Sequence, residues 1–436
     1  MKTLIKNVHV LTMDEHRQEY KNGYLLIEDE RIIAVGAMPE SLPAAEKVID
    51  GAGGILLPGF VNTHTHCGMI PFRSLGDDVP DRLRRFLFPL ENAYMTKDLV
   101  KASSAYAIAE MLLSGVTSFC DMYYFEDEVA EVCHAMQVRA VVGETIIDMP
   151  TCDSPNTQAS LAYCEKLLQK WQQHPLIKPA IAPHAPNTNK IADLQAIVAL
   201  SQKYQAPITM HVAEMDYEMT EFAEKYQQTP LAFLADLGYL DCEFILAHGI
   251  HLTQADIELL AAAKGQVSVA HCIAANTKSA KGVAPVKELV AQGITVGLGT
   301  DGPSSGNTLD LFTQMRMVVN FHKTKNHDRA LFPAKEIVAM ATTNGAKALG
   351  FKDVGSLEVG KKADLVLVET QSVNMFPIYD AYSALVYSAN ASNVAAVWVN
   401  GQQLVKNKEL VHENLTDLRA TLYQKMDKFV AAARQQ

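Results

Sequence analysis

The sequence predicts an α/β protein: a (β/α)8 TIM-type barrel with a small β-sandwich domain built from both chain ends. Two observations predict this fold class. Eight short apolar runs alternate with longer stretches of helical spacing in the middle of the chain, and short β-like runs with glycine turns occupy both ends. A strand followed by a helix, repeated eight times, is the pattern of a closed parallel barrel.

The first 57 residues are predicted to form short β-strands. Apolar runs lie at residues 4–11, 24–28 and 31–35, and Gly23 and Gly36 punctuate them. Because glycine between short apolar runs marks turns, these runs indicate a small sheet and not a set of helices.

The middle of the chain supplies the eight predicted barrel strands. They lie at residues 60–64, 117–121, 139–147, 177–184, 208–211, 244–248, 266–271 and 294–301. Apolar residues at helical spacing connect them, for example over residues 99–113, 191–204 and 231–237. The barrel is therefore predicted to span residues 58–352, somewhat more than the typical ~250 residues.

Two helical stretches, residues 307–321 and 333–349, follow the last barrel strand, and β character returns at residues 363–368 and 394–399. The end of the chain is predicted to be an amphipathic helix. Its apolar residues at helical spacing are Leu415, Leu418, Leu422, Met426 and Phe429. We therefore expect residues 1–57 plus 353–436 to form one β-sandwich domain with a terminal helix.

Charge and composition exclude several classes of protein. The chain has 38 Lys and Arg against 49 Asp and Glu, a net charge of −11, which argues against nucleic acid or a membrane surface as a partner. No apolar stretch approaches the roughly 18 residues of a membrane helix, and the first 13 residues lack a signal-peptide pattern. Seven scattered cysteines do not form a disulfide framework, so we expect a reduced, cytoplasmic protein.

His64 and His66 end the first predicted barrel strand. Side chains two apart in a strand share a face, so both imidazoles are expected to point into the barrel mouth. Two adjacent histidines make half of a zinc or iron site. The alternative is a pair of ordinary polar residues at a strand end.

Three further residues end later strands. His211 ends the fifth, His248 the sixth and Asp301 the eighth, which places each at the C-terminal rim where barrel active sites lie. Imidazole nitrogens and one carboxylate oxygen suit Zn²⁺. A single histidine at a strand end more often forms a structural hydrogen bond than binds a metal. However, it is improbable that all of these histidines and Asp301 lie on one rim by chance.

Glu214 follows His211 by three residues and is expected on the loop after the fifth strand. From this loop its carboxylate could reach over a metal. A bound metal lowers the pKa of its water to roughly 7, and a nearby carboxylate can take that proton and pass it on. The alternative is a solvated surface glutamate.

Five motifs together resemble the amidohydrolase superfamily. They are residues 58–66 (PGFVNTHTH), 211–214 (HVAE), 247–252 (AHGIHL), 299–302 (GTDG) and 355–365 (GSLEVGKKADL). Within this superfamily the chain is similar to the branch of 5′-methylthioadenosine/S-adenosylhomocysteine deaminases and their chlorohydrolase-type relatives. The resemblance covers nearly the whole chain, and it implies the barrel and the β-sandwich that the residue pattern predicts.

The resemblance also implies roles for individual residues. It implies one Zn²⁺ per chain on His64, His66, His211 and Asp301. It implies that Glu214 is the proton shuttle, that His248 steadies the group under attack, and that Asp301 helps to activate water. It implies that His184 and Glu91 bind substrate, Glu91 through ribose hydroxyls, together with Glu214 and Asp301. For Glu91 a helix-starting acid is the alternative.

Binuclear relatives need a carboxylated lysine at the end of the fourth strand. Residues 182–184 read Ala-Pro-His, and Lys178 comes too early. A single metal is therefore favoured. Cys67 and His251 are expected to be structural, because strand parity points Cys67 away from the metal and His251 lies on a loop.

The chain departs from its relatives at three places. Glu144 lies where arginines would grip the carboxylate of S-adenosylhomocysteine, and we expect it to repel that substrate. No Trp precedes the Pro-Leu-Glu segment, where Phe86 or Phe88 could replace it. In the loop after the seventh strand His271 and Asn276 remain, but the residues between them differ.

The expected function is a zinc-dependent hydrolytic deaminase of an aminated purine-type nucleoside, adenosine or 5′-methylthioadenosine-like, which releases ammonia. The alternative is a triazine- or guanine-type amino- or chlorohydrolase on the same scaffold, and a remote alternative is a metal-binding protein without turnover. The expected partner is a small heterocyclic amine, with no nucleic acid and no membrane. A homodimer or homotetramer is left open.

Overall fold

The computed structural model describes residues 1–435 and contains two compact units. The first comprises residues 1–62, 109–118 and 310–413. The second comprises residues 63–108 and 119–309, and the chain from Asn414 onward. The predicted domain boundaries at residues 57/58 and 352/353 stay a prediction.

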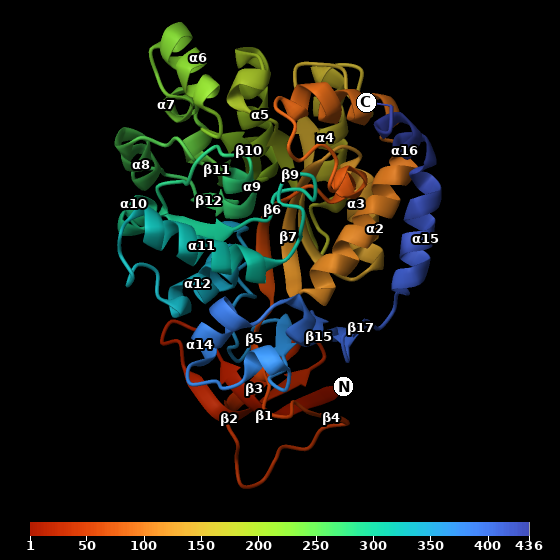
Figure 1. Cartoon of the computed structure of the whole chain (residues 1–436), viewed down its shortest axis with the longest axis vertical. Helices are drawn as coiled ribbons and strands as arrows, with labels where there is room; N and C mark the ends of the chain where they lie inside the picture. Colours follow the sequence, from red (N-terminus) through yellow and green to blue (C-terminus); the bar gives the residue numbers. More distant parts are fainter. Residues whose placement is uncertain (436) are drawn as a thin grey trace. The chain divides into compact units, whose positions relative to one another are not determined.

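Within residues 1–435 the first unit contains a nine-stranded sheet made from both chain ends (Figure 1). Its order is β17 (Glu409–Leu410), β16 (Gln402–Lys406), β15 (Val394–Val399), β14 (Leu365–Val368), β5 (Ile55–Pro58), β1 (Lys2–Leu11), β2 (Glu19–Glu28) and β3 (Arg31–Ala37), with β4 (Lys47–Asp50) paired to β1. The two chain ends meet where β5 and β14 pair antiparallel, with Leu57 opposite Val366. This pairing confirms the predicted β structure from both ends.

The core of this sheet consists of apolar side chains on one face. Leu25 and Ile27 on β2 are two residues apart and fully buried, as are Leu56 on β5, Leu365 on β14 and Trp398 on β15. Each such side chain contributes roughly 1.5–3 kcal/mol when it is taken from water. All four residues of β5 and all four of β14 are buried, so both faces of these two strands are covered.

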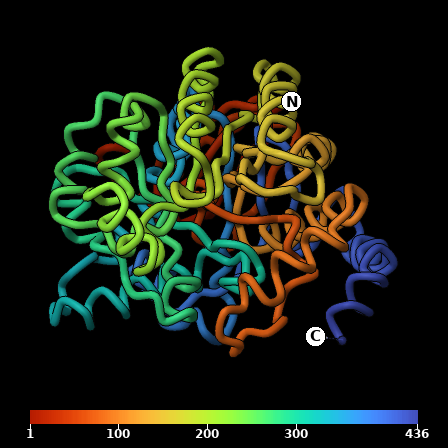
Figure 2. Tube along the Cα trace, turned by 90° about the horizontal axis from the view of Figure 1, so that it is seen from above, coloured from red at the N-terminus to blue at the C-terminus, as the bar shows by residue number. Residues whose placement is uncertain are grey.

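The second sheet of residues 1–435 is an eight-stranded barrel whose strands follow in chain order. They are β6 (Phe60–Thr65), β7 (Val116–Tyr123), β8 (Arg139–Ile146), β9 (Ile177–Pro183), β10 (Ile208–Val212), β11 (Phe244–His248), β12 (Val267–His271) and β13 (Thr295–Leu298). The strands from β8 to β13 pair parallel to their neighbours. Seen from above, the chain between about residues 120 and 300 winds round this ring (Figure 2).

The barrel closes between its first and last strands. The amide of Asp301 donates to the carbonyl oxygen of His64 over 3.0 Å. Gly299 permits this approach, because a Cβ there would lie 2.8 Å from the Cys272 sulfur and 3.0 Å from the His64 Cβ. A side chain at position 299 would therefore push against the strand that carries His64.

Helices and short turns connect the strands. The helices are α1 (Phe88–Tyr94), α2 (Lys97–Leu113), α3 (Glu126–Ala135), α4 (Thr157–Trp171), α5 (Ile191–Tyr204), α6 (Asp216–Tyr226), α7 (Pro230–Asp236), α8 (Gln254–Ala261), α9 (Ile273–Lys278), α10 (Val286–Ala291), α11 (Leu311–Lys325), α12 (Ala334–Ala341), α13 (Thr343–Ala348), α14 (Ala381–Ser383), α15 (Leu415–Lys425) and α16 (Asp427–Ala433). The short turns are η1 (Cys67–Phe72), η2 (Leu83–Leu87), η3 (Pro186–Thr188), η4 (Tyr239–Asp241), η5 (Val373–Met375), η6 (Ala384–Ser388) and η7 (Ala391–Asn393). None of the helices in residues 1–435 combines the length and the apolar character needed to cross a bilayer.

The predicted fold class is confirmed. Many predicted strands and helices differ from the observed ones by one or two residues at an end, and three larger differences have a physical cause. The eighth strand ends at Leu298 and not at Asp301, because Asp301 has a φ of +57°, which a strand cannot continue. The helix predicted over residues 307–321 begins at Leu311, where the Asp310 carboxylate caps it. The stretch at 333–349 forms two helices that meet at Thr342, whose backbone is not helical.

Candidate active site

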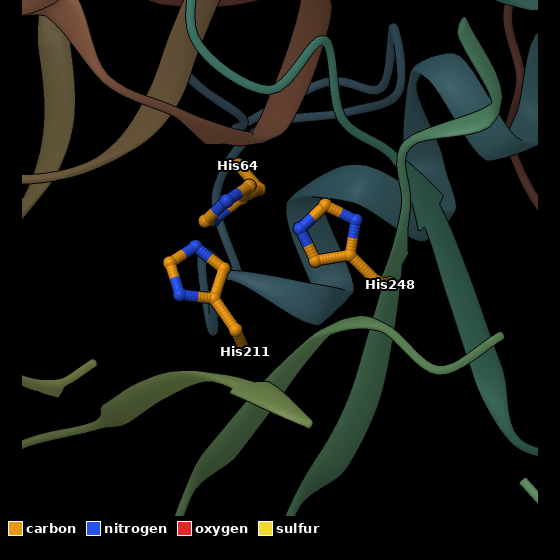
Figure 3. Close-up of side chains that lie close together, drawn as sticks. All are labelled: His64, His211 and His248. Carbon is orange, nitrogen blue, oxygen red and sulfur yellow. The ribbon is translucent and has the colours of Figure 1, made fainter. Parts of the chain in front are cut away.

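The predicted metal ligands lie together at the C-terminal ends of the barrel strands. His64 is in β6 and His66 follows it, His211 is in β10, His248 ends β11, and Asp301 lies three residues beyond β13. All five side chains are buried. Figure 3 shows the imidazoles of His64, His211 and His248 turned toward one another.

The distances define one cluster with two overlapping triads. In each triad the nitrogen or oxygen atoms that could bind a metal lie within 4.8 Å of one another: His64, His211 and His248 form one, and His64, His66 and Asp301 the other. His66 Nε2 lies 3.2 Å from Asp301 Oδ1, and His248 Nε2 lies 3.9 Å from Asp301 Oδ2. The carboxylate of Asp301 therefore joins the two groups.

Hydrogen bonds on the far side of three rings fix their orientation. Nδ1 of His66 donates to the carbonyl oxygen of Met122, and Nδ1 of His211 donates to that of His184 over 2.7 Å. Nδ1 of His248 lies 2.8 Å from the side-chain oxygen of Asn276. Since a carbonyl oxygen only accepts, Nδ1 carries a proton in all three rings. Nε2 is therefore the atom of each ring that is turned toward a metal or a reacting group.

The electrostatics of the cluster suit a cation. Burial lowers the pKa of His64 and His211 well below the usual range, so both rings are neutral, as metal ligands must be. Burial also lowers the pKa of His66, but the hydrogen bond and the charge of Asp301 outweigh it and raise the pKa to about 9. Asp301 thus attracts positive charge to this point, and a divalent ion held by imidazole nitrogens and this carboxylate fits the donor set.

The backbone is strained where the site residues lie. Ala213, His248 and Asp301 have φ angles of +52°, +72° and +57°. Residues other than glycine rarely adopt this left-handed conformation, and its cost is tolerated where the surrounding structure imposes it. At all three positions the chain leaves a barrel strand. The turns bring the side chains of His248 and Asp301, and that of Glu214 next to Ala213, over the barrel mouth.

Glu214 lies in the loop between β10 and α6, as predicted. The buried carboxylate of Glu218 accepts from the amides of Ala213 (2.9 Å) and Glu214 (3.1 Å) and so fixes the loop. Oε1 of Glu214 lies 2.5 Å from Lys281 Nζ and 3.7 Å from His248 Nε2. Burial raises the pKa of Glu214, but the charges of His248 and Lys281 outweigh it and lower the pKa, which favours an ionised base.

His184 lies directly after β9, beside the metal cluster. Its ring centre is 5.1 Å from that of His211 and 6.0 Å from that of Phe88. Burial lowers the pKa of His184 to about 4, so the ring is neutral and can donate to or accept from a neutral heterocycle. Of the two candidates for an aromatic wall, Phe88 is the one in contact distance of this ring.

Glu91 is buried in the first turn of α1. The hydroxyl of Tyr123 donates to Glu91 Oε1 over 2.8 Å, and the Tyr123 ring centre is 6.5 Å from that of His66. Burial raises the pKa of Glu91 to about 7 despite this hydrogen bond. A tyrosine therefore connects the carboxylate predicted to bind ribose with the metal cluster.

Comparison with known proteins identifies the family. The pattern of the amidohydrolase family matches residues 55–404. The chain belongs to the amidohydrolase family. The 5-methylthioadenosine/S-adenosylhomocysteine deaminase of Syntrophobacter fumaroxidans is 37% identical over 421 residues, which cover 95% of each chain.

Two other amidohydrolase-type relatives are informative. The 5′-deoxyadenosine deaminase of Methanosarcina barkeri is 36% identical over 412 residues, 94% of each chain. The crystal structure of an adenosine deaminase from Xanthomonas campestris with bound zinc superposes with a TM-score of 0.95, at 33% identity over 98% of each chain. The resemblance stated from the sequence motifs is therefore confirmed at the level of the family.

One interpretation of the sequence is wrong in its geometry. Glu144 was expected to face the substrate and to repel a carboxylate. In the structure it is fully buried, and its Oε2 accepts from the amide of Glu126 at the start of α3. Burial raises the pKa of Glu144 well above its usual range, so this side chain is not a free negative charge that could repel a substrate carboxylate.

Two residues that the sequence placed near the metal lie outside both triads. Cys67 is fully buried, and its amide donates to Asp121 over 2.6 Å. His251 donates through its amide to the carbonyl oxygen of Ala213 over 2.9 Å. Both contacts are made by the backbone amides, and the structural role of the two side chains stays a prediction.

The sequence did not identify Tyr123, Glu218 or Lys281 as residues that contact the site. It named Asn276 but assigned it no role. Glu218 is four residues after Glu214, a spacing that could have indicated a carboxylate returning to the loop amides. Tyr123 ends β7 and could have been found as a strand-end polar residue. Lys281 lies 67 residues from its partner, and no local pattern indicates that contact.

Proposed function

We propose that the chain is a mononuclear, zinc-dependent hydrolytic deaminase that releases ammonia from an aminated purine nucleoside of the adenosine or 5′-methylthioadenosine type. The observation that carries the proposal is the placement of Glu214 beside His248 and Asp301, at the edge of a cluster of buried imidazoles. The relatives described above, all named for deamination of adenosine-type compounds, support the same reaction.

His64, His66, His211 and Asp301 are the residues that would hold the metal. His248 is left out of this set because its Nε2 faces both Glu214 and Asp301, which suits contact with the reacting group. When bound here, zinc supplies Lewis acidity that lowers the pKa of water toward about 7. The fourth barrel strand, β9, ends in Ala182 and Pro183 and is followed by His184, so this strand end offers no lysine for a second metal.

Glu214 is the proton carrier in this proposal. Its ionised carboxylate takes a proton from the attacking water, whose oxygen bonds to the ring carbon that bears the amino group. Glu214 then gives this proton to the adjacent ring nitrogen. The second proton of the same oxygen then passes by way of Asp301 and Glu214 to the amino group. The carbon–nitrogen bond breaks, ammonia leaves, and the oxygen becomes the carbonyl oxygen of the product.

His248 and Asp301 orient the oxygen that attacks. Nε2 of His248 lies within 4 Å of both carboxylates, so it can hydrogen-bond the oxygen as negative charge develops there. Asp301 accepts a proton from the same oxygen through Oδ2. Preorganised groups of this kind lower the barrier because they need no rearrangement during the reaction.

The substrate-binding part of the proposal rests on Glu91 and His184. The carboxylate of Glu91, held by Tyr123, can accept hydrogen bonds from ribose hydroxyls. His184 and the Phe88 ring can bind the heterocycle. A triazine or guanine has no ribose, so use of Glu91 separates the nucleoside proposal from that alternative.

Ammonia release tests the proposal. Zinc-loaded protein is incubated with adenosine, 5′-methylthioadenosine, 5′-deoxyadenosine, S-adenosylhomocysteine, guanine and an aminotriazine. We expect turnover of the nucleosides, a loss of at least about 100-fold in Glu214→Gln, and a fall in kcat/KM in Glu91→Ala. Folded, zinc-loaded protein that releases no ammonia from any nucleoside contradicts the proposal, and full nucleoside activity in Glu91→Ala removes the ribose contact.

Two finer points belong to the same proposal. The seven cysteines are all free, which supports a reducing, cytoplasmic location. A homodimer or homotetramer stays open, and sedimentation of the purified protein measures it.

A further inference from the structure

A lysine contacts the carboxylate of Glu214 from the loop after α9. Lys281 Nζ lies 2.5 Å from Glu214 Oε1, and its side chain is only 26% exposed. Within residues 1–435, Lys281 is the basic residue that forms an ion pair with Glu214. The pair is therefore a short, mostly buried, charge-assisted hydrogen bond, which is stronger than an exposed ion pair.

The same short segment also holds His248. The amide of Lys281 donates to the carbonyl oxygen of Asn276 over 3.0 Å, and the Asn276 side chain contacts His248 Nδ1 over 2.8 Å. His248 Nε2 in turn lies 3.7 Å from Glu214 Oε1. Glu214, His248, Asn276 and Lys281 thus form a closed ring of contacts, and one six-residue segment fixes both side chains expected to act on the reacting group.

The ring distinguishes the two oxygens of Glu214. Oε1 contacts Lys281 and lies nearest His248, whereas no hydrogen bond within residues 1–435 is made to Oε2. A carboxylate held at one oxygen keeps the other in a fixed direction, so the proton it carries travels along one path. A carboxylate without this contact would rotate and lose that alignment.

We propose that Lys281 is a positioning residue for Glu214: its ammonium group holds Oε1 and leaves Oε2 as the atom that moves the proton. This inference rests on the proposed function, because it assumes that Glu214 carries a proton. The positive charge also disfavours a proton that stays on Glu214, which helps its delivery to a ring nitrogen that is only weakly basic.

Steady-state kinetics of Lys281→Met test this role. We expect kcat to fall about 10- to 100-fold, the range for loss of a hydrogen bond to a charged group, with KM changed less than threefold. Lys281→Arg keeps the charge and the donor and should recover most of the loss. Zinc content and melting temperature are measured on each variant, because a structural role would move these and not kcat alone.

Lys278→Met is the matched control. Lys278 lies three residues earlier, and its ammonium contacts Asp77 and Asn307 and not Glu214. The substitution Lys278→Met therefore removes one positive charge from the same part of the chain without changing the contacts among Glu214, His248, Asn276 and Lys281. We expect its kcat to match that of the unmodified protein.

A double-mutant cycle separates the inference from the proposed function. If Lys281 acts through Glu214, Lys281→Met should have no further effect in a Glu214→Gln background. The inference is overturned if Lys281→Met lowers kcat by the same factor in the Glu214→Gln background as in the unmodified protein. It is also overturned if Lys281→Met keeps full kcat, or if Lys278→Met loses as much kcat as Lys281→Met does. If Lys281→Met unfolds, Lys281→Gln replaces it in the same cycle. The two proposals can fail separately. If the unmodified protein is active, Glu214→Gln is inactive and Lys281→Met is unaffected, the role of Lys281 is wrong but the deaminase proposal stands.

Discussion

The side-chain oxygen of Asn276 lies 2.8 Å from Nδ1 of His248 and fixes which ring nitrogen faces the barrel mouth. Both side chains are buried, so the contact is not exchanged with water. Outer partners of this kind typically contribute about 10- to 100-fold to metal affinity or activity.

Asn276→Ala removes the acceptor and leaves a buried N–H without a partner. We expect kcat to fall about 10- to 100-fold, while zinc content stays near one per chain because His248 is not among the proposed ligands. Asn276→Asp retains an acceptor oxygen and is the control. Wild-type turnover in Asn276→Ala would show that the ring orientation is fixed by other contacts.

Asp301 supplies the negative charge that attracts a cation to the cluster. Asp301→Asn keeps the size of the side chain but removes this charge, so zinc affinity should fall by more than the about 10- to 100-fold typical of an outer partner. Competition with a chromogenic chelator measures it. Asp216→Asn, which removes an exposed carboxylate at the start of α6, is the control, and equal affinity in both variants contradicts the assigned ligand.

Glu91 should make stability depend on pH. Its pKa is raised by burial from 4.5 to about 7, so between these values the folded protein binds a proton that the unfolded chain does not. Stability therefore falls as pH rises through this window. Glu91→Gln has no such proton, and its stability relative to the parent should increase between pH 4.5 and 7 by up to about 3 kcal/mol.

Urea unfolding at pH 4.5, 5.5, 6.5 and 7.5 measures this difference. The exposed Glu224→Gln is the control, because it changes one carboxyl on the outer helix α6. Parallel pH curves for Glu91→Gln and the parent protein would mean that Glu91 has the same pKa in the folded and unfolded chain.

Gly299 is required by close packing and not by its backbone angles. A Cβ at this position would lie 2.8 Å from the Cys272 sulfur and 3.0 Å from the His64 Cβ. Gly299→Ala should cost about 1–3 kcal/mol of stability and weaken zinc binding, because relief of the contact moves His64. Gly36→Ala, whose new Cβ would meet Tyr24 at an ordinary 3.8 Å, should be near neutral. Guanidinium unfolding with and without a chelator separates the two effects.

Local pattern was sufficient for the barrel and for most of its site. The run at 244–248 and the helix at 191–204 have the same bounds in the sequence and in the structure, because hydrophobic periodicity and flanking turn residues mark both ends. His64, His66, His211 and His248 were predictable because each lies at a strand end, and all parallel strands of a barrel end on one rim.

What the sequence did not predict depends on contacts between distant residues. Glu144 lies in the expected strand, but the direction of its carboxylate follows from the position of α3, which the periodicity of β8 does not contain. Lys281 reaches Glu214 because a short helix, α9, carries the chain back across the mouth. Such placements follow from tertiary packing, and a single sequence carries no local signal for them.

The left-handed backbone at Ala213, His248 and Asp301 has a consequence for selection of heat-tolerant variants. Glycine adopts this conformation at no steric cost, which is worth about 1 kcal/mol where nothing else is lost. At positions 248 and 301 the exchange also deletes a buried imidazole or carboxylate, and the cavity and the unpaired partners that remain cost more than this gain. A screen scored on survival after heating would therefore select glycine at position 213 alone, where the side chain carries no reactive group.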